Sequence, residues 1–137
     1  LFIKNYYSTL GYMFCISEDY EKAADYLEKF IKIKQQEGDD FEKDLINTSL
    51  LYLSYKELGK IYDKKEIKTL LQESIDKDLD SYLNFILYRL LEDRFYLEKA
   101  YKQLWEKVNA MDDELKEKFL TYPIPKQIIE EYNKVFK

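Results

Sequence analysis

The chain has 137 residues, a length that suits one domain, and its charged residues (36% of the total) are interspersed, with a formal net charge of -5. This balance disfavours nucleic acid as a partner and gives no attraction to an anionic membrane surface. The apolar runs are only a few residues long, as at 50–53, so no direct membrane insertion is expected. Histidine is absent and Cys15 is the only cysteine, which excludes imidazole catalysis, imidazole metal ligands and an internal disulfide.

Residues that form turns are scarce. The chain has three glycines and two prolines, where average usage would give roughly 10 and 7. Few turns imply long elements, and a chain with 46% apolar and 36% charged residues suits amphipathic helices. Apolar residues also recur at helical spacing from one end to the other, which predicts an all-α chain of about eight helices.

The first two helices are expected at about 2–36, with a turn at the small polar residues 17–19. Gly38 is a C-terminal stop signal, and the aspartates at 39–40 are suited to cap the next helix. The second pair of helices is therefore predicted to start near Phe41.

Two further turns divide the middle of the chain. Gly59 is the expected end of the third helix, and a loop near 62–63 precedes its partner. A third pair is predicted to begin after the polar residues 76–78 and to turn at 92–94.

The first pair of helices resembles the tetratricopeptide repeat. That family's pattern has an aromatic residue, Leu-Gly and a second aromatic in its first helix, then an aromatic, Ala and apolar residues in the second. Those positions are filled here by Tyr7, Leu10, Gly11 and Phe14, and by Tyr20, Ala23, Leu27 and Phe30. The resemblance implies that Gly11 and Ala23 allow the two helices to approach closely. Two positions depart mildly from the pattern. The family favours Ala where this chain has Phe30, and it favours Gly in the turn where this chain has Glu18.

The second and third pairs match the repeat more loosely. About three extra residues follow Tyr62, and Tyr88 stands where the family has Gly. The matching positions are Leu51, Tyr55, Gly59 and Ile61 in the second pair, and Leu87, Leu91, Leu97, Ala100 and Leu104 in the third.

The C-terminal part is predicted to cap the stack. Asp112 and Asp113 precede a short helix, Pro123 and Pro125 break it, and a final helix follows. The segment 119–136 resembles the end of large bacterial signalling proteins that attach helical repeats to an ATPase, kinase or cyclase module. Together with the helical pattern at the first residue, this suggests a cytoplasmic fragment of a longer protein.

The resemblance implies a right-handed solenoid of about three hairpins with a capping helix pair. It forms one domain over 1–137, comprising a clear repeat at 4–37, degenerate repeats at 45–76 and 79–110, and capping helices at 112–137.

The many aromatic residues have two interpretations. Tyr7, Phe14, Tyr20 and Tyr55 are expected to fill the interfaces between hairpins. Tyr12 and Tyr82 fall, by the family's spacing, on the concave face, where a core role and a binding role are both open. Trp105 is expected to pack against the C-terminal helices rather than to act as a binding hot spot.

No catalytic, metal-binding or cofactor-binding site is expected. The charged residues that follow Cys15, Glu18 and Asp19, are acidic and would raise the pKa of its thiol, so Cys15 is interpreted as a small packed hydrophobe. The paired acids at 39–40, 76–78 and 112–113 precede helices and are interpreted as caps. The calcium-loop-like stretch 76–80 lacks the required Gly and closing Glu, and no Gly-rich phosphate loop is present.

The resulting hypothesis is a non-catalytic module that binds a protein or peptide partner and belongs to a signalling or regulatory protein. Carried over by register from the resembled repeat, the concave lining would be Asn5, Ser8, Tyr12, Ile16, Ser49, Leu53, Lys56, Tyr82, Phe85, Arg89 and Glu92. Two alternatives stay open: a sensory domain with a closed pocket for a peptide or other ligand, and a structural spacer without an apolar groove.

Overall fold

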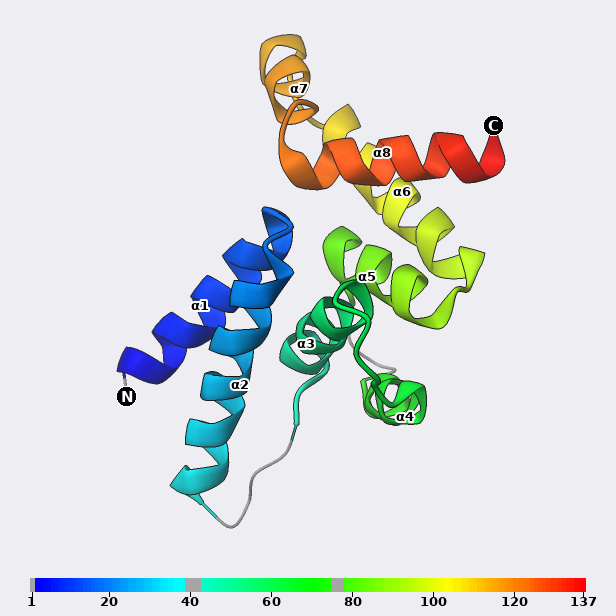
Figure 1. Cartoon of the computed structure of the whole chain (residues 1–137). Helices are drawn as coiled ribbons and strands as arrows, with labels where there is room; N and C mark the ends of the chain where they lie inside the picture. The colour runs from blue at the N-terminus through cyan, green and yellow to red at the C-terminus, as the bar shows by residue number, and fades with distance from the viewer. Residues whose placement is uncertain (1, 39–42, 75–77) are drawn as a thin grey trace. The chain divides into compact units, whose positions relative to one another are not determined.

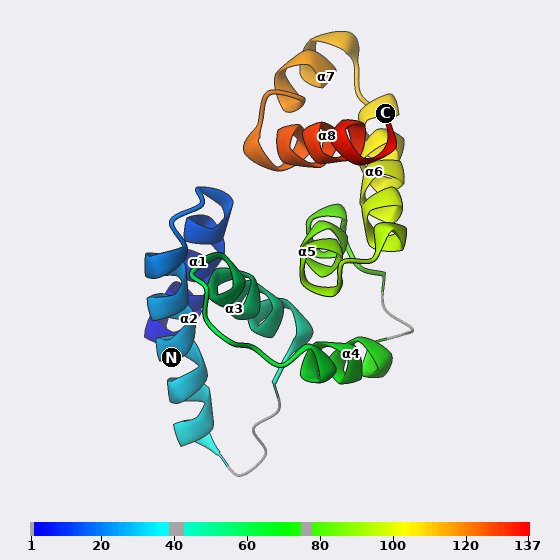
Figure 2. The ribbon, with the colours of Figure 1, turned by 45° about the vertical axis from the view of Figure 1, so that its right-hand side comes forward.

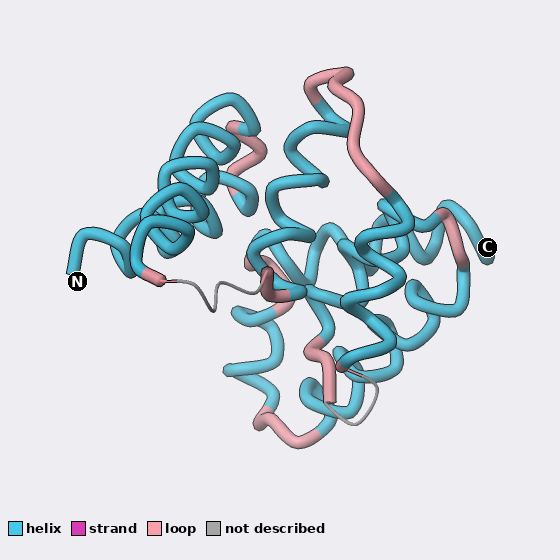
Figure 3. The backbone as a smooth tube through the Cα atoms, turned by 90° about the horizontal axis from the view of Figure 1, so that it is seen from below, coloured by secondary structure: helices cyan, strands magenta, loops and turns pink. Residues whose placement is uncertain are grey.

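The structure is a computed structural model that describes residues 2–38, 43–74 and 78–137. Within these ranges the chain consists of α-helices and connecting loops, with no strand (Figure 3). The helices labelled in Figure 1 are α1 (Phe2–Ile16), α2 (Tyr20–Glu37), α3 (Leu45–Glu57), α4 (Lys64–Glu73), α5 (Ser81–Leu91), α6 (Arg94–Asn109), α7 (Asp113–Phe119) and α8 (Pro123–Phe136). The prediction of an all-α chain is therefore confirmed.

The chain divides into two compact units. The first unit, Leu1–Lys77, holds α1 to α4, and the second, Asp78–Lys137, holds α5 to α8. The continuous solenoid that would join the hairpins stays a prediction.

Helices α1 and α2 form an antiparallel hairpin (Figures 1 and 2). They meet where α1 has no side chain: a Cβ atom added at Gly11 would lie 2.5 Å from Cγ and 2.6 Å from Cδ2 of Leu27. Leu27 and Ala23 are both fully buried, and Ala24 is 3% exposed. Gly11 thus marks the close approach of the two helices that the repeat resemblance implied, and Ala23, the other small residue of that expectation, is buried.

The turn between α1 and α2 contains a residue in the left-handed backbone region. Glu18 has φ 64°, and the amide of Asp19 donates a hydrogen bond to the carbonyl of Phe14. The turn between α5 and α6 is built in the same way, with Glu92 at φ 56°. In both turns the next residue, Asp19 or Asp93, is the N-cap of the second helix. The position of Glu18, where the resembled family favours Gly, is therefore one where the backbone itself favours Gly.

Replacing Glu18 by Gly is expected to preserve or raise stability. A left-handed residue with a side chain costs roughly 1–2 kcal/mol, and glycine removes that cost. Glycine also increases the entropy of the unfolded chain, which offsets about 0.5–1 kcal/mol of the gain. Thermal unfolding should show a midpoint equal to or slightly above that of the original chain. Glu21→Gly, placed inside α2, is the matched control and should lower the midpoint.

Two helices, α3 and α5, begin a few residues after their predicted starts. The N-cap of α3 is Asp44, whose carboxylate accepts a hydrogen bond from the amide of Asn47 at 2.7 Å. The proposed caps at 39–40 and the predicted start at Phe41 lie outside the described residues. Helix α5 is capped by Asp80 rather than by Asp78. Asp112 does cap α7, as predicted, through the amide of Leu115.

Helix α4 departs from the arrangement of the first hairpin. Figures 1 and 2 show it crossing α3 instead of lying along it. Gly59, at φ 74°, follows α3, and an irregular stretch leads to the N-cap of α4, Asp63. Ile67 of α4 is fully buried, whereas Ile61, which matched the repeat in sequence, is 96% exposed. The residues between Gly59 and Asp63 separate the two helices, so the second pair lacks the close contact of the first.

The second unit is built on the α5–α6 hairpin. Leu87, Leu90, Leu97 and Ala100 are fully buried in it. Asn84 is also fully buried, and its amide nitrogen lies 2.8 Å from Oε1 of Gln103 on α6. Gln103 in turn donates to the carbonyl of Leu79 at 2.7 Å, so the side chains tie the start of α5 to α6.

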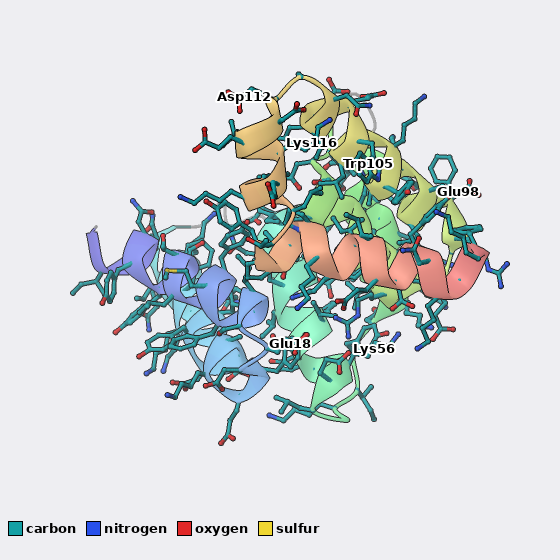
Figure 4. The ribbon with its side chains drawn as sticks, turned by 90° about the horizontal axis from the view of Figure 1, so that it is seen from above. Glu18, Lys56, Glu98, Trp105, Asp112 and Lys116 are labelled. Atoms are coloured by element: carbon teal, nitrogen blue, oxygen red, sulfur yellow. The ribbon has the colours of Figure 1, made fainter. Side chains whose placement is uncertain are left out.

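The C-terminal helices pack on this hairpin. Helix α8 crosses α6 (Figure 1) and contacts both α5 and α6. Tyr132 of α8 stacks on Tyr101 of α6 with ring centroids 3.6 Å apart, and Ile128 is fully buried. Trp105, labelled in Figure 4, packs edge-on against Tyr101.

Two expectations about the tail are corrected. Pro123 lies in the first turn of α8 instead of in a break before it, because proline at that position loses no helical hydrogen bond. Leu115, which belongs to the segment 112–137 that was predicted to cap the stack, is 50% exposed. The short helix α7 has no buried residue, so α8 carries most of the packing.

Candidate functional site

The predicted lining residues of α1 lie on one face of the helix. Asn5 is exposed, and Ser8, Tyr12 and Ile16 are half-buried. The hydroxyl of Ser8 donates to Oδ1 of Asn47 at 2.8 Å, so this face of α1 borders α3. The structure thus brings together α1 and α3, the first helices of two successive predicted hairpins.

The contribution of α3 to the predicted lining needs correction. Ser49 is fully buried and Leu53 is 1% exposed, so neither presents a surface to a partner. Helix α3 contacts α1, α2 and α4 and is buried almost all round from Thr48 to Ser54. Lys56, labelled in Figure 4, lies in the last turn of α3 and is half-buried, so it is the α3 residue that fits the prediction.

The predicted lining residues of α5 divide in the same way. Tyr82 and Phe85 are 5% and 4% exposed, which corrects their assignment to an open groove. Arg89 is half-buried, and Glu92 is exposed in the left-handed turn. Because these residues belong to the second unit, a groove running from α1 to α5 stays a prediction.

A second surface, which the sequence did not indicate, follows the seam between α2 and α3. The hydroxyl of Tyr55 on α3 donates to Oε1 of Glu28 on α2 at 2.6 Å. The hydroxyl of Tyr52 donates to Glu66 of α4, which also pairs with Lys43. These bonds fix both tyrosine rings, which stack with centroids 6.0 Å apart.

The same contacts shift the pKa values of Tyr52, Tyr55 and Glu66. Burial and then the hydrogen bond to Glu66 raise the pKa of Tyr52 above its ordinary value of 10. Burial and the bond to Glu28 raise the pKa of Tyr55 in the same way. Burial alone would raise the pKa of Glu66, but the bonds from Lys43 and Tyr52 lower it overall.

An alkaline titration should detect the two fixed tyrosines. In the unfolded chain their phenols lose the proton near pH 10, whereas the folded chain keeps it to higher pH. The stability that they contribute is therefore complete below about pH 10 and is lost as the pH rises further. Phenolate absorbance should show a late phase that shrinks in the variant Tyr52→Phe/Tyr55→Phe. Thr9→Ala, at an exposed residue of α1 that has no phenol, is the control and should leave that phase unchanged. An unchanged late phase in the double variant would contradict the assignment.

Metal sites and membrane-spanning helices are two further possibilities for the described residues. No group of three or more Cys, Asp or Glu side chains in residues 2–38, 43–74 and 78–137 is placed to hold a metal ion. In the same residues, no helix combines the length and the apolar character needed to cross a membrane. A scan against protein-family models and searches of curated proteins and of solved structures found no match.

Proposed function

We propose that the chain is a non-catalytic protein-interaction module that binds a segment of a partner protein on the face shared by α1 and α3. The Ser8–Asn47 hydrogen bond carries the proposal, because it joins these two helices along the predicted lining. Cys15 supports the same arrangement, since its sulfur lies 3.4 Å from the hydroxyl of Ser54 in α3.

We also propose that the first hairpin is a tetratricopeptide-like repeat. The approach of α1 to α2 at Gly11 and the left-handed residue at Glu18 are features that this repeat's pattern would require. In such repeats the first helix of each hairpin lines the binding surface, and α1 and α3 hold those places here. Because the segment 119–136 resembles the end of large bacterial signalling proteins, we propose that the module belongs to a cytoplasmic signalling or regulatory protein of bacterial type.

The binding surface of the first unit is then reduced to the residues that are not buried. These are Asn5, Ser8, Tyr12, Ile16 and Lys56. Tyr12 is the expected centre of the surface, because a half-buried aromatic side chain offers a large apolar area with a polar tip.

Replacement of Tyr12 tests this function. Dodecapeptides from a random display library would be selected on the full chain, and the affinity of each enriched peptide measured by fluorescence anisotropy. Tyr12→Ala should weaken at least one class of peptides about tenfold or more, the range typical of a hot spot. Tyr6→Ala is the matched control, because Tyr6 lies on the same helix but is 62% exposed on another side.

Two results would contradict the proposed function. One is the absence of any enriched peptide that depends on Tyr12. The other is an equal loss of affinity in Tyr12→Ala and Tyr6→Ala. Circular dichroism of both variants would show whether the helices are intact, so that a loss of binding is not mistaken for unfolding.

A further inference from the structure

The seam between α2 and α3 contains two adjoining hollows that share Glu28. We call them together the α2–α3 groove. The first hollow has a volume of about 570 Å³ and extends from the start of α2 to the residues after α3. The second has a volume of about 250 Å³ and lies between the later part of α2 and the residues of α3 from Thr48 to Tyr55. None of the lining residues belongs to the predicted concave face, so the groove is a separate surface.

The two hollows differ in charge. The first is lined by four carboxylates and two lysines, namely Asp19, Glu21, Asp25, Glu28, Lys22 and Lys60. Lys22 pairs with Asp19 at 3.8 Å, and Asp25 pairs with Lys29 at 3.1 Å. Acidic groups therefore prevail at this end even after the pairs within α2 are considered.

The second hollow is apolar in its middle and basic at its far end. Ile31 and Tyr55 are half-buried in its lining, and Leu51 and Tyr52 lie buried beneath them. Lys32 and Lys43 supply the positive charge, and Lys43 also pairs with Glu66. Tyr52 and Tyr55 are held by their hydrogen bonds to Glu66 and Glu28. A lining held in advance loses little side-chain entropy when a ligand binds.

We infer that the α2–α3 groove binds an extended peptide segment of a partner protein that carries a Lys or Arg, then a large apolar residue, then an acidic residue. The cation would face Glu21 and Asp25, the apolar side chain would contact the half-buried Ile31 and Tyr55, and the acid would face Lys32. Charge complementarity at both ends sets the direction of the segment.

The dimensions of the groove suit such a segment. Its lining runs along α2 from Asp19 to Gln35, which at about 1.5 Å per helical residue corresponds to about 24 Å. An extended segment advances about 3.3 Å per residue, so about seven residues would span that distance. Two adjoining hollows along this length, one lined mainly by acids and the other carrying lysines, fit an extended peptide better than a compact small molecule.

Charge reversal at the acidic end is the test. Dodecapeptides would be enriched on the full chain. Their affinities for the original chain and for the variant Glu21→Lys/Asp25→Lys would then be compared by fluorescence anisotropy. We expect a class with a basic residue before an apolar one that loses about tenfold or more in affinity. The same peptides with Glu in place of the basic residue should bind the double variant better than the original chain.

The matched control is Glu98→Lys/Glu106→Lys, which makes the same charge change on exposed residues of α6 (Glu98 is labelled in Figure 4). It should leave the affinity within about twofold if the effect is local. Three results would overturn the inference. The first is an equal loss of affinity in both double variants, the second is a set of enriched peptides without the basic–apolar pattern, and the third is the absence of any enriched peptide. A chain that dimerises in light scattering and becomes monomeric in Glu21→Lys/Asp25→Lys would also overturn it, because a second copy would then occupy the groove.

Failure of this inference is distinguishable from failure of the proposed function. Peptides that depend on Tyr12 report on the α1–α3 face, and peptides that depend on Glu21 and Asp25 report on the α2–α3 groove. Each peptide class can be present without the other.

Discussion

Gly11→Ala is expected to destabilise the first unit, although alanine is the better helix former. The added Cβ would lie 2.5 Å from Cγ of Leu27, which is nearer than such atoms approach without movement. Leu27 is fully buried, so its branch carbon has no open space into which to move. Helix propensity would favour the change by about 1 kcal/mol, but overpacking costs about 1–3 kcal/mol, more when the helices must separate. We expect a net loss of stability, and a larger loss for Gly11→Leu.

A double-mutant cycle shows whether the loss of stability in Gly11→Ala comes from overlap between the added Cβ and Leu27. Leu27→Ala alone should cost about 2–5 kcal/mol through the cavity that it leaves. In Gly11→Ala/Leu27→Ala the overlap is gone, so the double variant should be no less stable than Leu27→Ala. Thermal or urea unfolding measures all three. The control Thr9→Ala, at an exposed position of the same helix, should change stability by about 0.5 kcal/mol or less. Additive losses in the cycle would contradict the close approach at Gly11.

The second large effect concerns the C-terminal helices. Truncation after Met111 removes α7 and α8, and with α8 the fully buried Ile128 and the ring of Tyr132 that stacks on Tyr101. A buried side chain of this size contributes about 1.5–3 kcal/mol before ordering costs. A few such contacts are comparable with the stability of a whole domain, about 5–15 kcal/mol. The truncated chain should therefore unfold at a much lower temperature or aggregate.

Two point variants test which C-terminal helix is responsible. Ile128→Ala should lower the free energy of unfolding by about 2–5 kcal/mol, because Ile128 is fully buried and its truncation leaves a cavity. Leu115→Ala is the matched control on α7 and should have little effect, since Leu115 is already 50% exposed. A truncated chain that melts like the full one and stays monomeric would show that α7 and α8 do not cap the unit. Equal effects of the two point variants would contradict the leading role of α8.

The first hairpin is the part that the sequence predicted best. The resemblance to the repeat pattern indicated a close approach of α1 and α2 at Gly11 and Ala23, because the residues of that pattern are local in the sequence. The starts of α3 and α5 were less predictable. Several acidic residues precede each helix, and any of them is suited to cap it, so composition alone does not select Asp44 or Asp80.

The candidate surfaces were predicted only in part. Helices α3 and α5 are apolar on most of their faces, so helical spacing does not distinguish a lining residue such as Leu53 from the core. The α2–α3 groove was missed for another reason. Its defining contacts join Tyr55 to Glu28 and Tyr52 to Glu66, residues that are 27 and 14 positions apart in the chain. Pairs at such separations depend on tertiary packing, for which a single sequence contains no local signal.

The most direct test of the proposed function is a map of amide chemical-shift changes when a peptide that depends on Tyr12 is added to the full chain. The proposal predicts that the largest changes cluster at Asn5, Ser8, Tyr12, Ile16 and Lys56, and that they disappear in Tyr12→Ala. Changes confined to other faces of α1, or to α7 and α8, would contradict the assignment of the binding surface to α1 and α3.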